Sequence, residues 1–326
     1  MNKKIDVLVV GAGISGIGAG YHLQKKCPET SFLILEGREN IGGTWDLFKY
    51  PGVRSDSDMY TLGYNFKPWK EQKAIADAPS ILKYLNETVE EFNLKSKIRF
   101  GKYVKKARWS SDSNQWTVDI EDKKTGKFSQ ILCSFIFMCS GYYSYKEGYT
   151  PHFEGKENFK GDIIHPQKWD TSFDYSNKKI VVIGSGATAV TIVPEMAKTA
   201  KHVTMLQRSP TYVVAAPEKD NLANKLRKYL PLKFTYWFIR WRNILRQQYY
   251  FRLCKKYPKG VKNVIIREVK KKLGNDFDVK THFTPKYNPW DQRMCLVPDG
   301  DLFEQINQGK ASVVTDHIKN FTENGL

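Results

Sequence analysis

Two glycine-rich segments have the residue types and spacing needed to bind a phosphate group. Each follows an apolar run and precedes a helical pattern, so its backbone N–H groups can approach a pyrophosphate at a helix N-terminus. Both segments have the same flanking pattern. This makes it less favoured that they are two glycine turns that bind no nucleotide. The first segment contains Gly11, Gly13, Ser15 and Gly16, and the second consists of Ile183, Gly184, Ser185, Gly186, Ala187, Thr188 and Ala189.

The residue that ends the strand after each turn distinguishes the two expected ligands. Glu36 lies at this place after the first turn, and a carboxylate accepts hydrogen bonds from ribose hydroxyls, as in FAD. Gln207 and Arg208 lie there after the second turn, and a guanidinium pairs with the 2′-phosphate of NADPH. We therefore expect FAD at the first turn and NADPH at the second.

The elements that must position these turns are strands alternating with helices. Apolar runs at 5–10 and 32–35 surround the first turn, and runs at 179–183 and 202–206 surround the second. The expected fold is α/β, with two Rossmann-like dinucleotide-binding domains and a helical insertion in the second. The predicted parts are an FAD-binding domain over 1–145, a linker over 146–174, and an NADPH-binding domain over 175–326, with the insertion at about 218–280.

Composition narrows the class of protein further. The 326 residues are 41% hydrophobic with a net charge of +18, and no apolar run is long enough to span a membrane. The five cysteines are irregularly spaced without a CxxC pair, which favours a reducing cytoplasm over a disulfide framework or a zinc site. Much of the basic excess lies at about 222–272. A solvated helical face is the favoured interpretation, and contact with an anionic membrane surface stays open.

A further motif carries a family resemblance. Phe159, Gly161, His165, Trp169 and Asp170 match the pattern F-x-G-x-x-x-H-x-x-x-W-D just before the second turn. This pattern is the signature of type I Baeyer–Villiger monooxygenases. Segments 42–45, 50–58, 139–143 and 287–293 also resemble that family, most closely its ethionamide-activating subgroup. The resemblance extends over essentially the whole chain.

The resemblance implies roles for individual residues. Arg293 is similar to the active-site arginine, and Asp56 to the acid that orients it. His165 is expected to be structural rather than catalytic, and Gln292 stands where several members have a lysine that helps bind the 2′-phosphate. Arg54 and Ser55 resemble neighbours of the nicotinamide nucleotide, and Gly43, Thr44, Trp45, Asp46, Leu47 and Val104 resemble FAD contacts.

The implied chemistry is oxygen insertion. In the family, NADPH reduces FAD, and the reduced flavin binds O₂ as a C4a-peroxide that converts ketones to esters or oxygenates sulfur in thioethers and thiocarbonyls. Family members continue with a further strand and an Ala-Thr-Gly turn, and the Glu323-Asn324-Gly325 turn pattern predicts that a strand follows. Whether the chain is a fragment, a frameshifted product or a natural short form stays open. Three functional hypotheses also stay open: a working monooxygenase, a nucleotide-binding remnant without turnover, and a protein that binds membrane surfaces.

Overall fold

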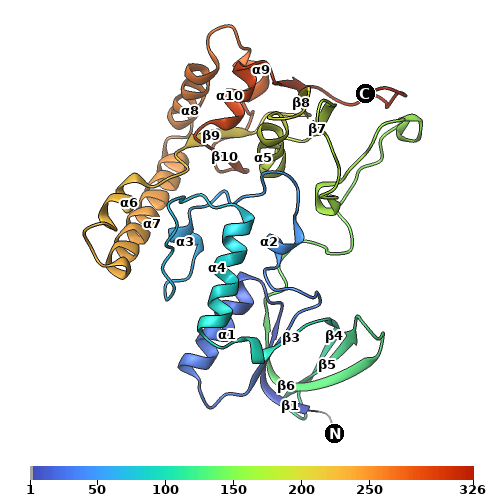
Figure 1. The fold of residues 1–326 in the computed structure, drawn as a ribbon, viewed down its shortest axis with the longest axis vertical. Coiled ribbons are helices and arrows are strands. Elements are labelled where there is room, and N and C mark those ends of the chain that lie inside the picture. Colours follow the sequence, from blue (N-terminus) through green and yellow to red (C-terminus); the bar gives the residue numbers. More distant parts are fainter. Residues whose placement is uncertain (1–2) are drawn as a thin grey trace. The chain divides into compact units, whose positions relative to one another are not determined.

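The computed structural model describes residues 3–326, which form two compact units. The first contains the chain up to Phe48 together with Ala78–Gly148, and the second contains Lys49–Asp77 and Tyr149–Leu326. Figure 1 shows the elements of both, and each unit is described here by itself.

The first unit is built on a six-stranded mixed sheet in the order β3-β2-β1-β6-β5-β4. Strands β3, β2, β1 and β6 are parallel, whereas β5 pairs antiparallel with both β6 and β4. Alternating and continuous apolar runs explain these strands, because Leu8, Ile34 and Val118 are all fully buried. The strands are β1 (Lys3–Val10), β2 (Phe32–Leu35), β3 (Ile98–Arg99), β4 (Lys102–Ser110), β5 (Gln115–Asp122) and β6 (Phe128–Met138).

Helices α1 (Ile14–Lys26) and α4 (Ala78–Glu91) pack together in this unit, and α1 also contacts β1, β2 and β6 (Figure 1). In α4 the buried residues Ile81, Leu85 and Val89 recur every four positions, so they form one apolar stripe. The short helices α2 (Thr44–Leu47) and η1 (Lys95–Lys97) complete the unit.

The second unit contains two parallel sheets. The three-stranded sheet has the order β11-β8-β7, and the two-stranded sheet pairs β10 with β9. The strands are β7 (Lys179–Ile183), β8 (His202–Gln207), β9 (Tyr212–Ala216), β10 (Met294–Pro298) and β11 (Ala311–Thr315). Both expected strand–turn–helix units are therefore present, and the predicted α/β fold is confirmed.

Helices occupy the stretch where an insertion was expected. They are α6 (Asn221–Leu226), α7 (Leu232–Lys256), α8 (Pro258–Leu273) and α9 (Val279–Phe283). The other helices of the unit are α3 (Met59–Leu62), α5 (Ala187–Met196), α10 (Asp301–Asn307), η2 (Lys156–Asn158) and η3 (Pro166–Lys168). Within 3–326, no helix is both long and apolar enough to cross a membrane.

Segment 49–77 clusters with the second unit, although the predicted boundaries put it inside the first domain. The physical reason is a set of contacts over long sequence separations. Arg54 forms an ion pair with Asp301, and Lys73 forms one with Glu218. The segment therefore brings Arg54, Ser55 and Asp56 into the unit that holds the second glycine turn.

Candidate functional site

The first glycine turn has a backbone that only glycine allows. Gly11 has φ +104, and a Cβ there would lie 2.4 Å from the carbonyl oxygen of Cys139. A Cβ at Gly16 would lie 1.8 Å from the carbonyl oxygen of Gly11. The turn therefore closes tightly against the end of β6 and directs the chain into α1.

The N-terminus of α1 is open to an anion. Its N-cap is Gly13, which provides no side chain to accept from the first N–H groups of the helix. Gly43, with φ +55, lies beside it, because its Cα is 3.6 Å from the place of a Gly13 Cβ. Ser15 is exposed in the first turn of the helix, so its hydroxyl is accessible. These features form a cradle of the kind that a pyrophosphate occupies.

Glu36 lies next to this cradle, as its position after β2 predicts. Its side chain is 4% exposed, and its Oε2 accepts a hydrogen bond from the Ala12 N–H at 2.7 Å. Its Oε1 accepts from the Arg38 N–H at 3.0 Å. Each carboxylate oxygen has a further lone pair, so the group is fixed in place and can still accept from ribose hydroxyls.

Arg38 is a functional candidate that sequence reasoning missed. Its Nη2 lies 2.5 Å from Oδ2 of buried Asp46, and its Nη1 donates to the carbonyl of Gly43 at 3.2 Å. The guanidinium also lies 5.6 Å from the centre of the Tyr145 ring. Arg38 thus ties α2, which contains Thr44, Trp45, Asp46 and Leu47, to the cradle. The sequence signal for Arg38 is a cation two residues after Glu36, the acid expected to accept from ribose hydroxyls.

Val104 has a different setting. It lies on β4 and packs, half-buried, against the core cluster that contains Leu8 and Leu35. The register of β4 shifts directly after it. The structure therefore gives its side chain a packing role, while its backbone stays a predicted adenine contact.

The second turn repeats the design of the first. Gly184 has φ +137, and Gly186 is the N-cap of α5, again without a side chain to accept from the helix N–H groups. Ser185 Oγ lies 3.0 Å from Thr211 Oγ1, which holds the turn against β9. The N-terminus of α5 can therefore accept a second pyrophosphate.

Gln207, which ends β8, and Arg208, which follows it, lie in different environments. Gln207 is 2% exposed, and its Nε2 donates to the His282 carbonyl at 2.7 Å and to Thr315 Oγ1 at 2.9 Å. Its side chain is therefore used in packing inside the unit. Arg208, by contrast, is exposed. Of the two, Arg208 is the group available to a phosphate.

Arg293, on the strand-entry segment before β10, lies at the second turn. Its Nη1 is 2.7 Å from the place of a Gly186 Cβ, so the exposed guanidinium covers the N-cap of α5. Asp56 does not come within ion-pair distance of it among the described residues, but both charges act on Cys295. Burial raises the pKa of that thiol to about 11, while Arg293 lowers it and Asp56 raises it.

Arg54 and Ser55 differ in whether their side-chain polar atoms have hydrogen-bond partners. Arg54 Nη1 lies 2.6 Å from Asp301 Oδ2, whereas its Nη2 is buried and finds no acceptor within the described part of the chain. Ser55 is 4% exposed, and its Oγ accepts from the Ser57 N–H at 3.0 Å. A buried guanidinium nitrogen without an acceptor is costly, and a bound anionic ligand would supply the missing partner.

The signature residues before the second turn make local contacts. His165 Nδ1 accepts from the Gln167 N–H at 3.2 Å, and Asp170 accepts from the Ser172 hydroxyl at 2.6 Å. Trp169 contacts the rings of Phe173 and Tyr175 edge to face. The Phe159 ring contacts that of Phe321 and packs close to the backbone of Gly161.

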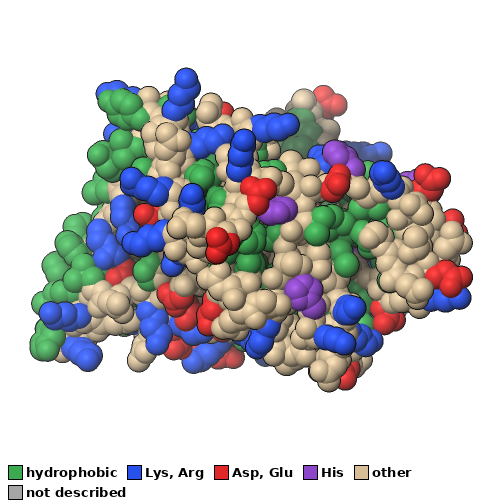
Figure 2. Space-filling view, turned by 90° about the horizontal axis from the view of Figure 1, so that it is seen from above, with side chains coloured by type: hydrophobic (Ala, Val, Ile, Leu, Met, Phe, Trp, Pro, Cys, Tyr) green, Lys and Arg blue, Asp and Glu red, His purple; other side chains and the backbone are tan. Residues whose placement is uncertain are grey.

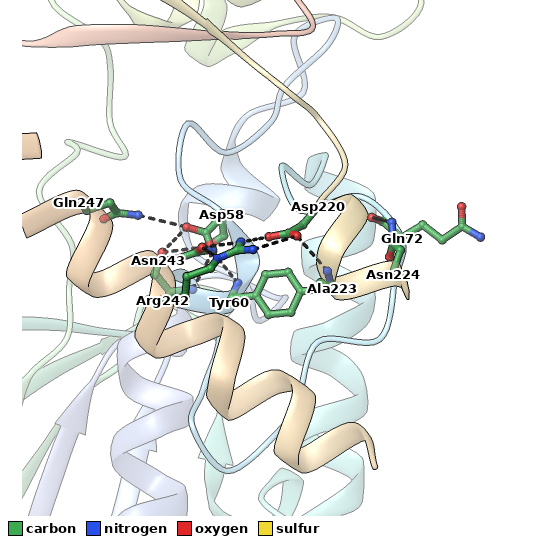
Figure 3. A network of polar contacts seen from close by, with 10 residues as sticks. Asp58, Tyr60, Gln72, Asp220, Ala223, Asn224, Arg242, Asn243 and Gln247 are labelled. Carbon is green, nitrogen blue, oxygen red and sulfur yellow. Dashed lines mark hydrogen bonds and ion pairs between the residues drawn. The ribbon is translucent and has the colours of Figure 1, made fainter. Parts of the chain in front are cut away.

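A polar network holds the segment that follows Asp56 (Figure 3). Asp58 caps α3 by accepting from the N–H groups of Tyr60 and Thr61, and it also accepts from Asn243 Nδ2 at 2.9 Å and Gln247 Nε2 at 3.1 Å of α7. Arg240, on the same helix, donates to the carbonyls of Tyr60 and Gly63. One face of α7 therefore fixes the position of residues 58–63.

Comparison with known proteins agrees with this architecture. A model of the flavin-binding monooxygenase-like family (FMO-like) matches residues 2–325. The FAD-containing monooxygenase EthA of Mycobacterium tuberculosis (strain H37Rv) is 53% identical over 327 residues, covering 100% of this chain and 66% of that protein. The probable FAD-binding monooxygenase AlmA of Acinetobacter baylyi is 52% identical, covering 100% and 65%.

A solved structure shows the same fold. OTEMO, crystallised in complex with FAD and NADP (form 3), superposes with a TM-score of 0.79 at 22% identity, covering 98% of this chain and 68% of that one. The chain spans slightly less than two thirds of the length of the curated relatives it matches. The family resemblance expected from the sequence is confirmed, and the chain belongs to the flavin-binding monooxygenase-like family.

Proposed function

We propose that the chain binds FAD at the first glycine turn and NADPH at the second, and acts as a monooxygenase. The observation that carries this proposal is the pair of open, glycine-capped helix N-termini, one beside buried Glu36 and the other followed by exposed Arg208. The matched relatives support it, since EthA is named an FAD-containing monooxygenase and OTEMO was crystallised with FAD and NADP.

The residues of the first unit would hold FAD. Backbone N–H groups at the α1 N-terminus, beside Gly43, would donate to its pyrophosphate, and Glu36 would accept from its ribose hydroxyls. Arg38 keeps α2 in place through Asp46 and the Gly43 carbonyl. When bound and reduced, the flavin would supply the activation of O₂.

The residues of the second unit would hold NADPH. Backbone N–H groups at the α5 N-terminus would donate to the pyrophosphate, and Arg208 would pair with the 2′-phosphate. The buried Nη2 of Arg54 is a further donor to the nucleotide. The proposed catalytic residues are Arg293, as a fixed positive charge that stabilises negative charge in the reaction, and Asp56, as the acid that orients this arginine. Both charges act on the Cys295 thiol, which supports their placement near the same site.

The proposed reaction inserts one oxygen atom of O₂ into a ketone, or onto the sulfur of a thioether or thiocarbonyl. The alternative is a chain that binds one or both nucleotides without turnover. To distinguish the two hypotheses, the purified chain is mixed with FAD, the unbound FAD is removed, and the visible absorption spectrum is recorded. Retained flavin absorbance that bleaches with NADPH, followed by ester or sulfoxide formation, supports the monooxygenase. Retained flavin without product supports the alternative, and no retained flavin contradicts the proposed FAD site in this chain.

Two variants test the assigned roles. We expect Arg293→Ala to bleach the flavin with NADPH but to form no ester or sulfoxide, whereas Arg267→Ala, an exposed arginine of α8, should behave as wild type. Product formation by Arg293→Ala at a near wild-type rate would overturn the role of Arg293. Arg208→Ala should lose its preference for NADPH over NADH. An unchanged ratio of kcat/KM for the two nucleotides would remove Arg208 from the site.

A further inference from the structure

The long helix α7 has a buried face and an exposed apolar face. On one face Thr235, Ile239 and Asn243 recur every four residues and are buried against the second unit. The other face is solvent-exposed. It consists of Phe234, Trp237, Phe238, Trp241, Leu245 and Tyr249, with exposed fractions of 42–65%, and we call it the α7 outer stripe.

The inner face of α7 already has its partners. Asn243 and Gln247 donate to Asp58 (Figure 3). Arg240 donates to the carbonyls of Tyr60 and Gly63, and Tyr236 donates to the carbonyl of Tyr64. Packing against the second unit therefore explains the inner residues and leaves the outer stripe without a structural role there. A continuous exposed apolar stripe of this kind marks an interaction surface.

The charge around the stripe is strongly one-sided. Between Asp220 and Glu268 the sequence contains thirteen Lys and Arg residues and no acidic residue. Some of these cations are used inside the protein, such as Arg242, which pairs with Asp220, and Arg240. Others are exposed, including Lys225, Lys228, Lys233, Arg246 and Arg252. Lys233 precedes Trp237 by one helical turn, and Arg252 follows Tyr249 by three residues, so cations border the stripe at both ends.

Figure 2 shows hydrophobic and basic side chains next to each other along its left edge, the side on which α6 and α7 lie in Figure 1. Aromatic side chains with exposed tips, combined with Lys and Arg, are the composition of segments that lie in a lipid headgroup layer. A protein partner would need complementary acids at several places along 25 residues of helix, whereas an anionic bilayer presents negative charge everywhere.

We propose that the α7 outer stripe docks the protein onto an anionic lipid bilayer, with α7 parallel to the membrane plane. The helix lies on the surface and does not span it, since no helix within 3–326 is apolar enough to cross. Indole and phenol rings enter the headgroup region, and Lys228, Lys233 and Arg252 contact lipid phosphates. This proposal is independent of the proposed function, because none of these residues belongs to the two nucleotide sites.

The test uses the 326-residue chain and two vesicle preparations, one of phosphatidylcholine alone and one with phosphatidylglycerol. Flotation should recover the protein with the anionic vesicles only, and Trp fluorescence should shift to shorter wavelength on binding. The triple variant W237Q/W241Q/L245Q should lose the fluorescence shift and bind on the order of tenfold more weakly. The variant K228E/K233E/R252E should bind on the order of a hundredfold more weakly, because each basic residue near an anionic surface contributes about 1 kcal/mol.

Matched controls keep the result interpretable. Tyr149→Ser removes an aromatic side chain that is 87% exposed elsewhere in the second unit, and K201E/K310E reverses two exposed lysines of the sheet region. Both should bind vesicles as wild type does, and circular dichroism should show that every variant is folded. Absence of binding to anionic vesicles, equal binding by the stripe variants and their controls, or burial of the stripe in a homodimer seen by sedimentation would each overturn the proposal.

Discussion

Arg293 and Gly186 lie in direct contact: the Arg293 Nη1 is 2.7 Å from the place that a Cβ at Gly186 would occupy. Gly186 has an ordinary φ of −81, so the backbone conformation does not require glycine there. Instead, the Arg293 guanidinium occupies the space that a Cβ at residue 186 would need. The glycine of the second turn therefore serves two purposes, because it opens the α5 N-terminus and admits Arg293.

This contact predicts the effect of Gly186→Ala. The clash is with the far end of a flexible side chain, so Arg293 should move and the fold should persist. We expect the melting temperature to change little. Formation of the proposed product should fall on the order of tenfold or more, because small displacements of a group with the role proposed for Arg293 are costly. Thermal unfolding and single-turnover product formation measure the two effects. Gly260→Ala is the control, since nothing lies within 4 Å of a Cβ there. A stable variant with wild-type product formation would contradict the prediction.

The first turn predicts a contrast between two of its glycines. A Cβ at Gly16 would lie 1.8 Å from the Gly11 carbonyl oxygen, which belongs to the backbone and cannot rotate away. Gly16→Ala should therefore destabilise the protein by about 3 kcal/mol or more. At Gly13 the nearest atom would be 3.6 Å away, so Gly13→Ala should cost about 1 kcal/mol or less. Urea unfolding followed by far-ultraviolet circular dichroism measures both, and equal losses would show that the turn is not closed as described.

The sequence predicted these turns because their causes are local. A strand, a glycine turn and a helix occupy consecutive residues, and the apolar runs at 32–35 and 179–183 became β2 and β7 with the same bounds. Contacts between distant parts were not predictable in this way. Arg54 and Asp301 are 247 residues apart, and no local pattern indicates that they pair. The placement of segment 49–77 follows from such contacts, so it emerged only from the structure.

The burial of Gln207 could have been predicted from the alternation of side chains along its strand. Side chains alternate across a strand, and Val203 and Met205 are buried, so Gln207 two residues later faces the same interior. Asp56 and Arg293 show a limit of a different kind. The resemblance predicts that the acid orients the arginine, yet no ion pair joins them within residues 3–326. These two residues lie far apart in the sequence, so no local pattern fixes their separation.

The Asp58 network predicts a loss of stability on mutation. Asp58→Ala removes the cap of α3 and leaves the Asn243 amide without its acceptor, so it should cost about 1–3 kcal/mol of unfolding free energy. Gln247→Ala removes only an exposed contact of 3.1 Å and should cost less than about 0.5 kcal/mol. Urea unfolding measures both variants. If Asp58→Ala is as stable as Gln247→Ala, α7 does not hold segment 58–63 through this carboxylate.

The buried thiol of Cys295 predicts a loss of stability at alkaline pH. Burial raises its pKa from 9.0 to about 11, so the unfolded chain releases this proton at a lower pH than the folded chain does. The stabilising effect of the neutral thiol is complete below about pH 9 and is lost as the pH rises toward 11. Its size is at most on the order of 2–3 kcal/mol. Because burial raises the pKa of Tyr60 to about 12, its effect begins above that of the thiol.

Two serine variants isolate this effect. Cys295→Ser removes the titrating group, so its unfolding free energy should fall less steeply between pH 8.5 and 10 than that of the wild type. Cys27→Ser alters an exposed thiol and should keep the wild-type slope. Urea unfolding at several pH values measures the slopes directly. Parallel curves for Cys295→Ser and wild type would mean that the thiol titrates at its ordinary pKa, and that the site beside Arg293 is open to water rather than closed by β10.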